Sequence, residues 1–329
     1  MAKNSIDFNE VDSLEWCQII FQLVYSCAKA CLNNSKEEVK PMKKYLKLMR
    51  VHHYIKNGLI FTPLIFSGNL FNQELLLKSI LGFIAFSLIA SAIYIINDIQ
   101  DVDQDRLHPT KCKRPLAANL ISLTNAKILT ITLVIIAMII NVYAADNGLV
   151  SWVSLISYLM LNLAYSNGLK NYPIIDVAIL VSGFVLRVLY GAGITGIEIS
   201  NWLYLTVIAM SFYLGLGKRR NELIKQKNVS RKVLKYYNQG FLDKNMYMSL
   251  ALTITFYSLW TVDPVTIARI SNDYLVWTVP LVILICMKYS LNIEGDSDGD
   301  PVEVIIKDKV LMGMVALFVL ITLGIIYIG

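Results

Sequence analysis

Four aspartates lie within the nine-residue segment from Asn97 to Asp105, which reads NDIQDVDQD. If a helix continues through this segment, Asp98, Asp101 and Asp105 stand at i, i+3 and i+7 on one face, and Asn97 lies close to Asp101. Oxygen ligands on adjacent turns are typical of Mg²⁺ sites, where one or two carboxylates act together with substrate phosphates. We therefore predict that Asn97, Asp98, Asp101 and Asp105 bind a magnesium ion.

The position of these aspartates supports a functional interpretation. They follow directly on a long apolar run, from Ser79 to Ile96. Charges at the end of a membrane span are costly unless they are paired, and such residues are functional by default. The alternative is an acidic helix end that only stops the span at the water interface, and four acids in so short a segment favour the first interpretation.

The elements that position the aspartates must be membrane spans. The chain is 56% hydrophobic and 16% charged, with a mean hydropathy of +0.54, which excludes an ordinary soluble domain. Apolar stretches predict an all-α, polytopic membrane protein with about nine transmembrane helices around a central cavity that faces the cytoplasm. The candidate spans are 57–72, 77–97, 124–143, 149–166, 174–193, 201–217, 247–263, 274–291 and 309–328.

Lysine and arginine are distributed unequally between the two sets of connections. One set holds the basic residues of segments 43–56, 106–114 and 218–244 together with Lys170, whereas the opposite set holds little beyond Lys78 and Arg269. The positive-inside rule therefore predicts an integral membrane protein whose active-site loops lie on the cytoplasmic face. Phosphorylated substrates and anionic lipids would meet the net charge of +6 there.

Two domains are predicted from this pattern. Residues 1–42 hold an amphipathic helix between Ser13 and Leu32 and a linker, and residues 43–329 form the transmembrane catalytic domain. The five cysteines form no CxxC pair, so we interpret them as structural.

Basic residues follow the aspartates closely. The segment RLHPTKCKRP, from Arg106 to Pro115, holds two prolines and is predicted to be a loop in which Lys111, Lys113 and Arg114 face the carboxylates. Acidic metal ligands beside lysine and arginine indicate that a phosphorylated group binds here, since arginine can bind phosphate with two hydrogen bonds.

Further polar residues lie where other spans begin or end. Arg187 lies three turns inside its span, about 16 Å along the axis, and we expect it to face an internal polar cavity or to pair with a buried polar group. The acidic loop from Glu294 to Glu303 lacks the glycine and the glutamate of a calcium-binding loop, so we interpret it as solvated. The candidate substrate-binding residues are Lys56, Asn57, Tyr165, Lys170, Asp176, Arg187, Lys218, Arg219 and Glu222.

NDIQDVDQD and the following HPTKCKRP resemble the first aspartate motif of the UbiA superfamily of intramembrane prenyltransferases, and the resemblance covers about residues 43–329. Three other segments look most like the decaprenyl-phosphate phosphoribosyltransferase branch of that superfamily. They are RVHHYIKNGLIFTPLIFSG, YSNGLKNYPIIDVAILVSGFVLRVLYGAG and LGKRRNEL. The chain departs from ordinary members in lacking their second DxxxD or DxxD motif, which argues against a prenyl diphosphate donor held by two aspartate clusters.

The resemblance implies a Mg²⁺-dependent transfer of 5-phosphoribose from phosphoribosyl pyrophosphate to a polyprenyl phosphate in the membrane, with release of pyrophosphate. Asp98, Asp101, Asp105, Lys111 and Arg114 would be the catalytic residues. The predicted partners are these two substrates and the membrane, and no nucleic acid.

Two other functions remain open at this point. The first is a conventional prenyltransferase with a prenyl diphosphate donor and an aromatic or glycerol-phosphate acceptor. The second is a transporter whose intramembrane charges line a pathway. Nearly all the charges cluster at one set of span ends, which favours an active site open to one side over a transport pathway.

Overall fold

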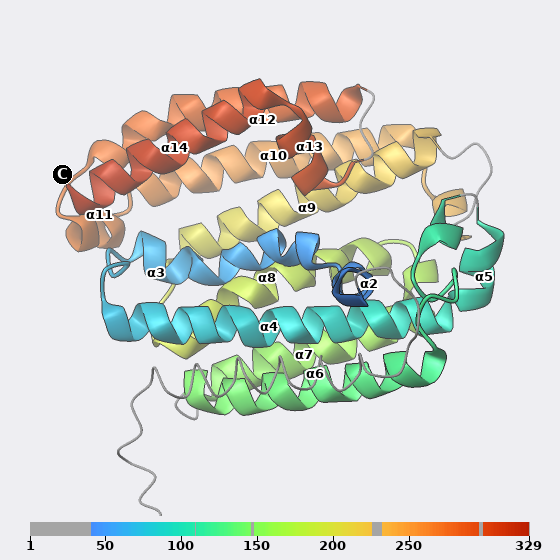
Figure 1. Ribbon diagram of the computed structural model, residues 1–329. Helices are drawn as coiled ribbons and strands as arrows, with labels where there is room; N and C mark the ends of the chain where they lie inside the picture. The colour runs from blue at the N-terminus through green and yellow to red at the C-terminus, as the bar shows by residue number, and fades with distance from the viewer. Residues whose placement is uncertain (1–40, 109, 146–147, 226–231, 296–298, 329) are drawn as a thin grey trace, which may run out of the picture. The chain divides into compact units, whose positions relative to one another are not determined.

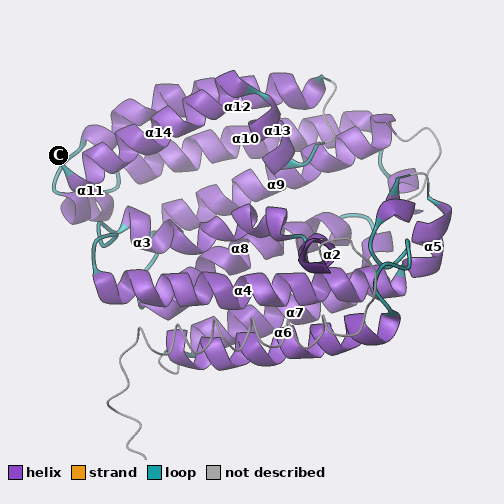
Figure 2. Cartoon of the chain, viewed as in Figure 1, coloured by secondary structure: helices purple, strands orange, loops and turns teal. Residues whose placement is uncertain are grey.

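The computed structural model describes residues 41–108, 110–145, 148–225, 232–295 and 299–328. Over these residues the secondary structure is helical, with no strand, as Figure 2 shows. This confirms the predicted all-α class. The amphipathic helix predicted between Ser13 and Leu32 lies outside the described residues.

The chain divides into two compact units, each described here by itself. The first holds residues 94–130 together with the chain up to Val51. Its described elements are α2 (Pro41–Met49), the end of α4 (Gln73–Gln100), α5 (Val102–Leu107), the 3₁₀ helix η2 (Lys111–Lys113) and the start of α6 (Leu123–Ala144). Helix α2 ends because Arg50 adopts a φ of 52°, a left-handed conformation that a helix does not continue through.

The second unit holds residues 52–93 and 131–329 and most of the apolar helices. Its helices pack in chain order, α7 on α8, α8 on α9 and α9 on α10, and α12 lies beside α14 (Figure 1). Besides the remaining parts of α4 and α6, its elements are η1 (Val51–Phe61), α3 (Thr62–Phe66), α7 (Leu149–Ser166), η3 (Leu169–Asn171), α8 (Ile175–Thr195), α9 (Asn201–Lys225), η4 (Lys232–Tyr236), α10 (Gln239–Thr261), α11 (Pro264–Ile270), η5 (Tyr274–Thr278), α12 (Val279–Glu294), α13 (Pro301–Lys307) and α14 (Lys309–Tyr327).

Six described helices are long and apolar enough to cross a membrane, and the pair α10 and α11, bent by 55°, makes a seventh if it is one span. Their outward side chains are apolar: Ile131, Met160 and Leu320 are each about three-fifths exposed or more. Such faces suit lipid rather than water. The predicted number of nine spans, and the side that the cavity faces, stay predictions.

The predicted first span, 57–72, differs from a regular span. Residues Val51–Phe61 form a 3₁₀ helix, and Thr62–Phe66 form a short α-helix with Pro63 in its first turn, where proline is tolerated. Helix α8 approaches this segment very closely at Gly191, where a Cβ would collide with the backbone of Ile60. The glycine therefore allows η1 to lie against α8, and η1 carries Lys56 and Asn57.

Candidate functional site

Asp98 and Asp105, the first and last carboxylates of the predicted face, meet at one arginine. Arg114 places the same nitrogen, Nη1, 3.1 Å from Asp98 Oδ1 and 2.6 Å from Asp105 Oδ2. Arg50 lies 2.5 Å from the same oxygen of Asp98, and its guanidinium stacks on Tyr94 at 4.8 Å from the ring centroid. Both carboxylates are buried. We name these four side chains, Asp98, Asp105, Arg50 and Arg114, the first cluster.

The helix is nearly continuous through the aspartate segment. Helix α4 ends at Gln100 and α5 begins at Val102, but the amide of Asp101 still donates to Asn97 O at 3.0 Å, and that of Asp105 to Asp101 O at 2.8 Å. The face predicted for Asp98 and Asp105 is therefore preserved. Asp103, which is not on that face, is exposed.

The basic segment after the aspartates is only partly a loop. Arg106 belongs to α5, and Lys111–Lys113 form a 3₁₀ turn, so the prediction of an irregular loop was wrong there. Lys111 and Lys113 form no ion pair with a described carboxylate, whereas Arg114 pairs with two. Of the three cations predicted to face the aspartates, Arg114 alone is brought to them in the described part of the chain.

The donor atoms of the first cluster suit a magnesium ion. No group of three or more His, Cys, Asp and Glu side chains converges in the described residues. Two carboxylates nevertheless reach a single cationic atom, and Mg²⁺ uses one or two carboxylates when phosphates and water complete its shell. Asp98 and Asp105 are the residues that would hold it, and the roles of Asn97 and Asp101 stay predictions.

A second cluster lies in the other unit, where α7, α8 and α9 meet. Arg219 donates from Nε to Asp176 at 2.5 Å, from Nη1 to Glu222 at 2.7 Å and from Nη2 to the Tyr165 hydroxyl at 3.1 Å. The side chains of Asp176 and Arg219 are both 0% exposed. The second cluster, as we name it, consists of Asp176, Arg219, Glu222 and Tyr165 together with Tyr237, which is described next. Lys170, also predicted at this junction, is half-buried in η3.

Tyr237 completes this cluster and was missed by the sequence analysis. Its hydroxyl donates to Asp176 Oδ1 at 2.6 Å and accepts from the Ile174 amide at 2.6 Å. Burial, and then the hydrogen bond to Asp176, raise the pKa of Tyr237 to about 12. Ile174 has a φ of 70° and a ψ of −47°, close to the strained γ-turn conformation. No sequence signal marked this tyrosine, because it lies in the basic segment 218–244, outside the predicted spans.

A third group, which we name the Lys56 group, joins Lys56, Lys218 and Asp300. Lys56 Nζ lies 2.6 Å from Asp300 Oδ2, and the two side chains are 15% and 14% exposed. The interpretation of the segment Glu294–Glu303 as solvated was therefore wrong for Asp300. The aspartate is held because it also caps α13, accepting from the Val302 amide at 3.1 Å.

Arg187 is buried among neutral partners. It donates to Asn57 Oδ1 at 2.7 Å, to the Tyr158 hydroxyl at 3.0 Å and to the Gly183 carbonyl, and it stacks on Phe86 at 5.1 Å. Asn57 in turn donates to Ser87 at 2.8 Å. Of the two sequence-based expectations, the pairing with buried polar groups is confirmed, and no described carboxylate pairs with this arginine.

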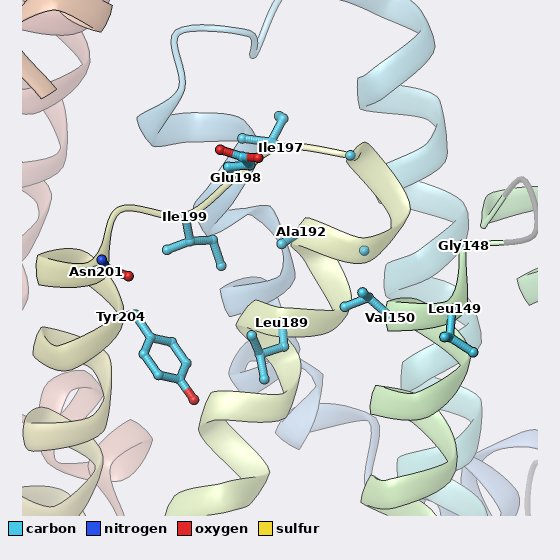
Figure 3. A pocket seen from close by; sticks show the side chains of 12 residues that line it. Gly148, Leu149, Val150, Leu189, Ala192, Ile197, Glu198, Ile199, Asn201 and Tyr204 are labelled. Atoms are coloured by element: carbon cyan, nitrogen blue, oxygen red, sulfur yellow. The ribbon is translucent and has the colours of Figure 1, made fainter. Parts of the chain in front are cut away.

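The cavities of the second unit differ in what they adjoin. The one in Figure 3, about 540 Å³, is lined by the start of α7, the end of α8 and the start of α9, so it lies at the opposite end of α8 from Asp176. An apolar cavity of about 480 Å³ between α8, α9 and α10 reaches Ile174 and Tyr237 and therefore adjoins the second cluster. Of these two cavities, the latter lies beside the second cluster.

The fold and these clusters define an all-helical integral membrane protein with buried acid–arginine clusters at helix ends. Residues 60–307 match the model of the UbiA prenyltransferase family, and the chain belongs to that family. It is similar to decaprenyl-phosphate phosphoribosyltransferase of Corynebacterium glutamicum, at 31% identity over 292 residues, which cover 86% of each chain.

Two other proteins show how wide the family is. Digeranylgeranylglyceryl phosphate synthase of Sulfurisphaera tokodaii is 28% identical over 174 residues, covering 51% of this chain and 57% of the relative. The structure of a UbiA homolog from Archaeoglobus fulgidus bound to GPP and Mg²⁺ superposes with a TM-score of 0.62 at 19% identity, covering 86% of this chain and 99% of the other. That likeness shows the fold.

Proposed function

We propose that the protein transfers 5-phosphoribose from phosphoribosyl pyrophosphate to a polyprenyl phosphate and releases pyrophosphate. The observation that supports the proposal most directly is the set of hydrogen bonds that Asp176 accepts. Its Oδ2 accepts from Arg219 and its Oδ1 from Tyr237, and the side chain is fully buried. Asp176 is thus committed to protein partners, and Glu222, the other acid of the second cluster, is bound to Arg219. These contacts disfavour a second metal-binding acidic site of the kind a prenyl diphosphate donor uses. The similarity to phosphoribosyltransferases along most of the chain supports the same donor.

The first cluster would bind the pyrophosphate leaving group. Asp98 and Asp105 would hold Mg²⁺, with Asn97 and Asp101 as the further predicted ligands, and the bound metal would neutralise charge on the leaving group. Arg114 and Arg50 carry the positive charges of this cluster, and each is partly exposed, so their guanidinium groups can bind phosphate oxygens. Lys111 is predicted to add a further positive charge.

The second unit would bind the phosphates and the sugar. Lys56 and Lys218 would hold the 5-phosphate or the acceptor phosphate, and Tyr165 and Lys170 the sugar hydroxyls. The acceptor phosphate is already anionic, so it needs positioning more than a general base. The ribose carbon resembles the oxocarbenium-like centre of glycosyl transfer. Asn57, Asp176, Arg187, Arg219 and Glu222 would act by fixing these elements.

The apolar cavity beside the second cluster suits the lipid chain. Leu205, Phe212 and Phe256 line its wall, and Ile174 and Tyr237 line the part that adjoins the buried acid. Isoprenoid units that enter this cavity from the lipid exchange one apolar environment for another, so van der Waals packing against its wall would hold them. We place the first isoprenoid units of the polyprenyl phosphate in this cavity.

Donor choice tests the proposal directly. The purified protein in lipid nanodiscs with Mg²⁺ is given either labelled phosphoribosyl pyrophosphate with a polyprenyl phosphate, or a labelled prenyl diphosphate with an aromatic or glycerol-phosphate acceptor. The product is separated from unreacted donor by chromatography. We expect label in the lipid fraction from the first donor. Label from the second donor alone would instead establish a conventional prenyltransferase, the alternative that similarity to digeranylgeranylglyceryl phosphate synthase favours.

The cytoplasmic position of the charged loops is proposed on the distribution of lysine and arginine. A reporter inserted near Ile197 should be accessible from outside the cell, and one near Asp243 should not. The reverse pattern would place the site away from the soluble donor.

A further inference from the structure

Three elements far apart in the sequence bring the Lys56 group together. Lys56 comes from η1, Lys218 from the end of α9, and Asp300 from the residue before α13. The proposed function places a substrate phosphate at the two lysines, and the inference below rests on that proposal. In the structure a carboxylate already lies at this position.

Both oxygens of Asp300 are in use. Oδ2 pairs with Lys56 at 2.6 Å, and Oδ1 accepts from the Val302 amide at 3.1 Å. Burial alone would raise the pKa of Asp300, but the charges of Lys56 and Lys218 outweigh burial and lower it. The carboxylate is therefore an ionised group held inside a site of positive charge.

Gly299 fixes where this carboxylate lies. Its φ is 75°, and a Cβ on it would lie 3.0 Å from the Cα of Lys218 and 3.2 Å from the Cβ of Asn221. A residue with a side chain would therefore be both strained and crowded at this point. The glycine lets the backbone lie directly against α9, and that contact brings Asp300 to the lysines.

Lys218 has no carboxylate of its own in the described chain. It lies beyond the predicted span 201–217, is half-buried, and makes no hydrogen bond or ion pair with a described residue. Burial lowers its pKa, and the charges of Glu222 and then Asp300 oppose that effect. Glu222 is bound to Arg219, so Asp300 is the carboxylate whose charge acts on both Lys56 and Lys218.

We propose that Asp300 is an internal competitor for the phosphate position at Lys56 and Lys218, and that it determines how tightly the site holds a bare phosphate anion. A substrate phosphate binds by taking Lys56 from this carboxylate. Such competition weakens the binding of inorganic pyrophosphate and phosphate, which have no ribose or lipid to add further contacts. Small anions therefore occupy the site less, whereas a substrate keeps the further contacts of its ribose or lipid.

Removing the charge of Asp300 while keeping its helix cap tests the proposal. Asn caps a helix as well as Asp does, so Asp300→Asn removes the charge and keeps the hydrogen bond to Val302. Binding of inorganic pyrophosphate to the full chain in nanodiscs is measured by calorimetry without turnover. Mg²⁺ is left out, because the proposed function places metal-bound pyrophosphate at the first cluster. We expect Asp300→Asn to bind pyrophosphate about 10-fold more tightly than the unmodified protein, as expected when a like charge is removed from an anion site. Asp300→Ser, which also keeps a cap, should do the same if the first variant folds poorly.

Asp308→Asn is a matched control. Asp308 caps α14 through the amides of Val310 and Leu311 and pairs with Lys288 at 2.8 Å, so it repeats the chemistry of Asp300 away from Lys56 and Lys218. Its substitution should leave pyrophosphate binding unchanged. Adding Lys218→Gln to Asp300→Asn should abolish the gain.

Equal or weaker pyrophosphate binding by Asp300→Asn, or a gain that survives Lys218→Gln, would overturn the proposal. Binding is read without turnover, so these results are independent of the donor experiment. Failure of the donor experiment would change the assigned reaction. The competition between Asp300 and a phosphate anion would still be decided by the binding measurements.

Discussion

The first and second clusters each contain a buried aspartate paired with arginine, but they differ in how far the arginine is exposed to solvent. Asp98 and Asp176 each receive an arginine at 2.5 Å, and both carboxylates are buried. The arginines differ: Arg50 and Arg114 are 21% and 29% exposed, whereas Arg219 is 0% exposed.

The difference in exposure decides whether an arginine can exchange its carboxylate for another anion or only stabilises the fold. A partly exposed guanidinium stays within reach of water when it leaves its carboxylate for a phosphate. A bound metal ion would then neutralise the buried carboxylates. An enclosed pair cannot separate without leaving a charge unsolvated, at a cost of several kcal/mol. We therefore propose that the first cluster binds metal and pyrophosphate, and that the second positions the α7–α8 junction.

The largest effect is expected at the first cluster. Asp105→Asn should lower turnover by at least about 1000-fold, as expected when a carboxylate that binds the catalytic metal is lost. Its melting temperature should stay near that of the unmodified protein. Turnover with phosphoribosyl pyrophosphate and a thermal melt in detergent measure the two quantities. Asp103→Asn, at an exposed position, is the control and should remain active. Full activity of Asp105→Asn, or activity in excess chelator, would refute the role of this cluster.

The second cluster should respond in stability instead. Asp176→Asn leaves the buried charge of Arg219 short of a partner, which costs about 3–5 kcal/mol when a buried pair is broken. We expect a lower melting temperature and a lower yield of folded protein. If the melting temperature were unchanged while activity vanished, Asp176 would belong with the residues that contact substrate, and the comparison would fail.

A smaller, purely functional effect is expected at the edge of the second cluster. Lys170→Ala should raise the KM for phosphoribosyl pyrophosphate more than it lowers kcat, since uniform binding is lost. Hydrogen bonds to charged groups contribute about 1.5–3 kcal/mol, so kcat/KM should fall about 10- to 100-fold. Steady-state kinetics with each substrate varied in turn measure this. An unchanged KM for this donor with impaired use of the lipid would assign Lys170 to the acceptor.

The smallest effect concerns the pH dependence of stability. The pKa of Tyr237 is raised from 10 to about 12 in the folded state, so the unfolded chain loses this proton first as the pH rises. The contribution of Tyr237 is therefore complete below pH 10 and is lost between pH 10 and about pH 12. Thermal melts at pH 9 and pH 11 should show a smaller loss of stability for Tyr237→Phe than for the unmodified protein. Parallel losses in the two proteins would contradict the hydrogen bond to Asp176.

The sequence predicted contacts that depend on local spacing. Asp98 and Asp105 lie on one face because helical geometry repeats, and in the structure both reach Arg114. The apolar runs likewise predicted α4, α6, α7, α8 and α14, since length and hydropathy are local properties.

Contacts that depend on how helices pack were not predictable. Arg50 with Asp98, Tyr237 with Asp176 and Lys56 with Asp300 join residues 48, 61 and 244 positions apart. A single charged or hydroxyl side chain carries no periodic signal that names its partner, so packing alone selects it. The 3₁₀ helix at Val51–Phe61 escaped prediction for a related reason, because apolar content does not distinguish it from an α-helix.

The backbone of Ile174 has a consequence for directed evolution of this protein. A β-branched residue at a φ of 70° stores about 1–3 kcal/mol, and its side chain is 63% exposed, so little packing offsets that cost. Ile174→Gly should therefore raise the melting temperature. It should also make the backbone amide of residue 174, which donates to the Tyr237 hydroxyl, less fixed in position. Selection for thermal tolerance alone would favour such a change at this position, and selection for turnover would remove it.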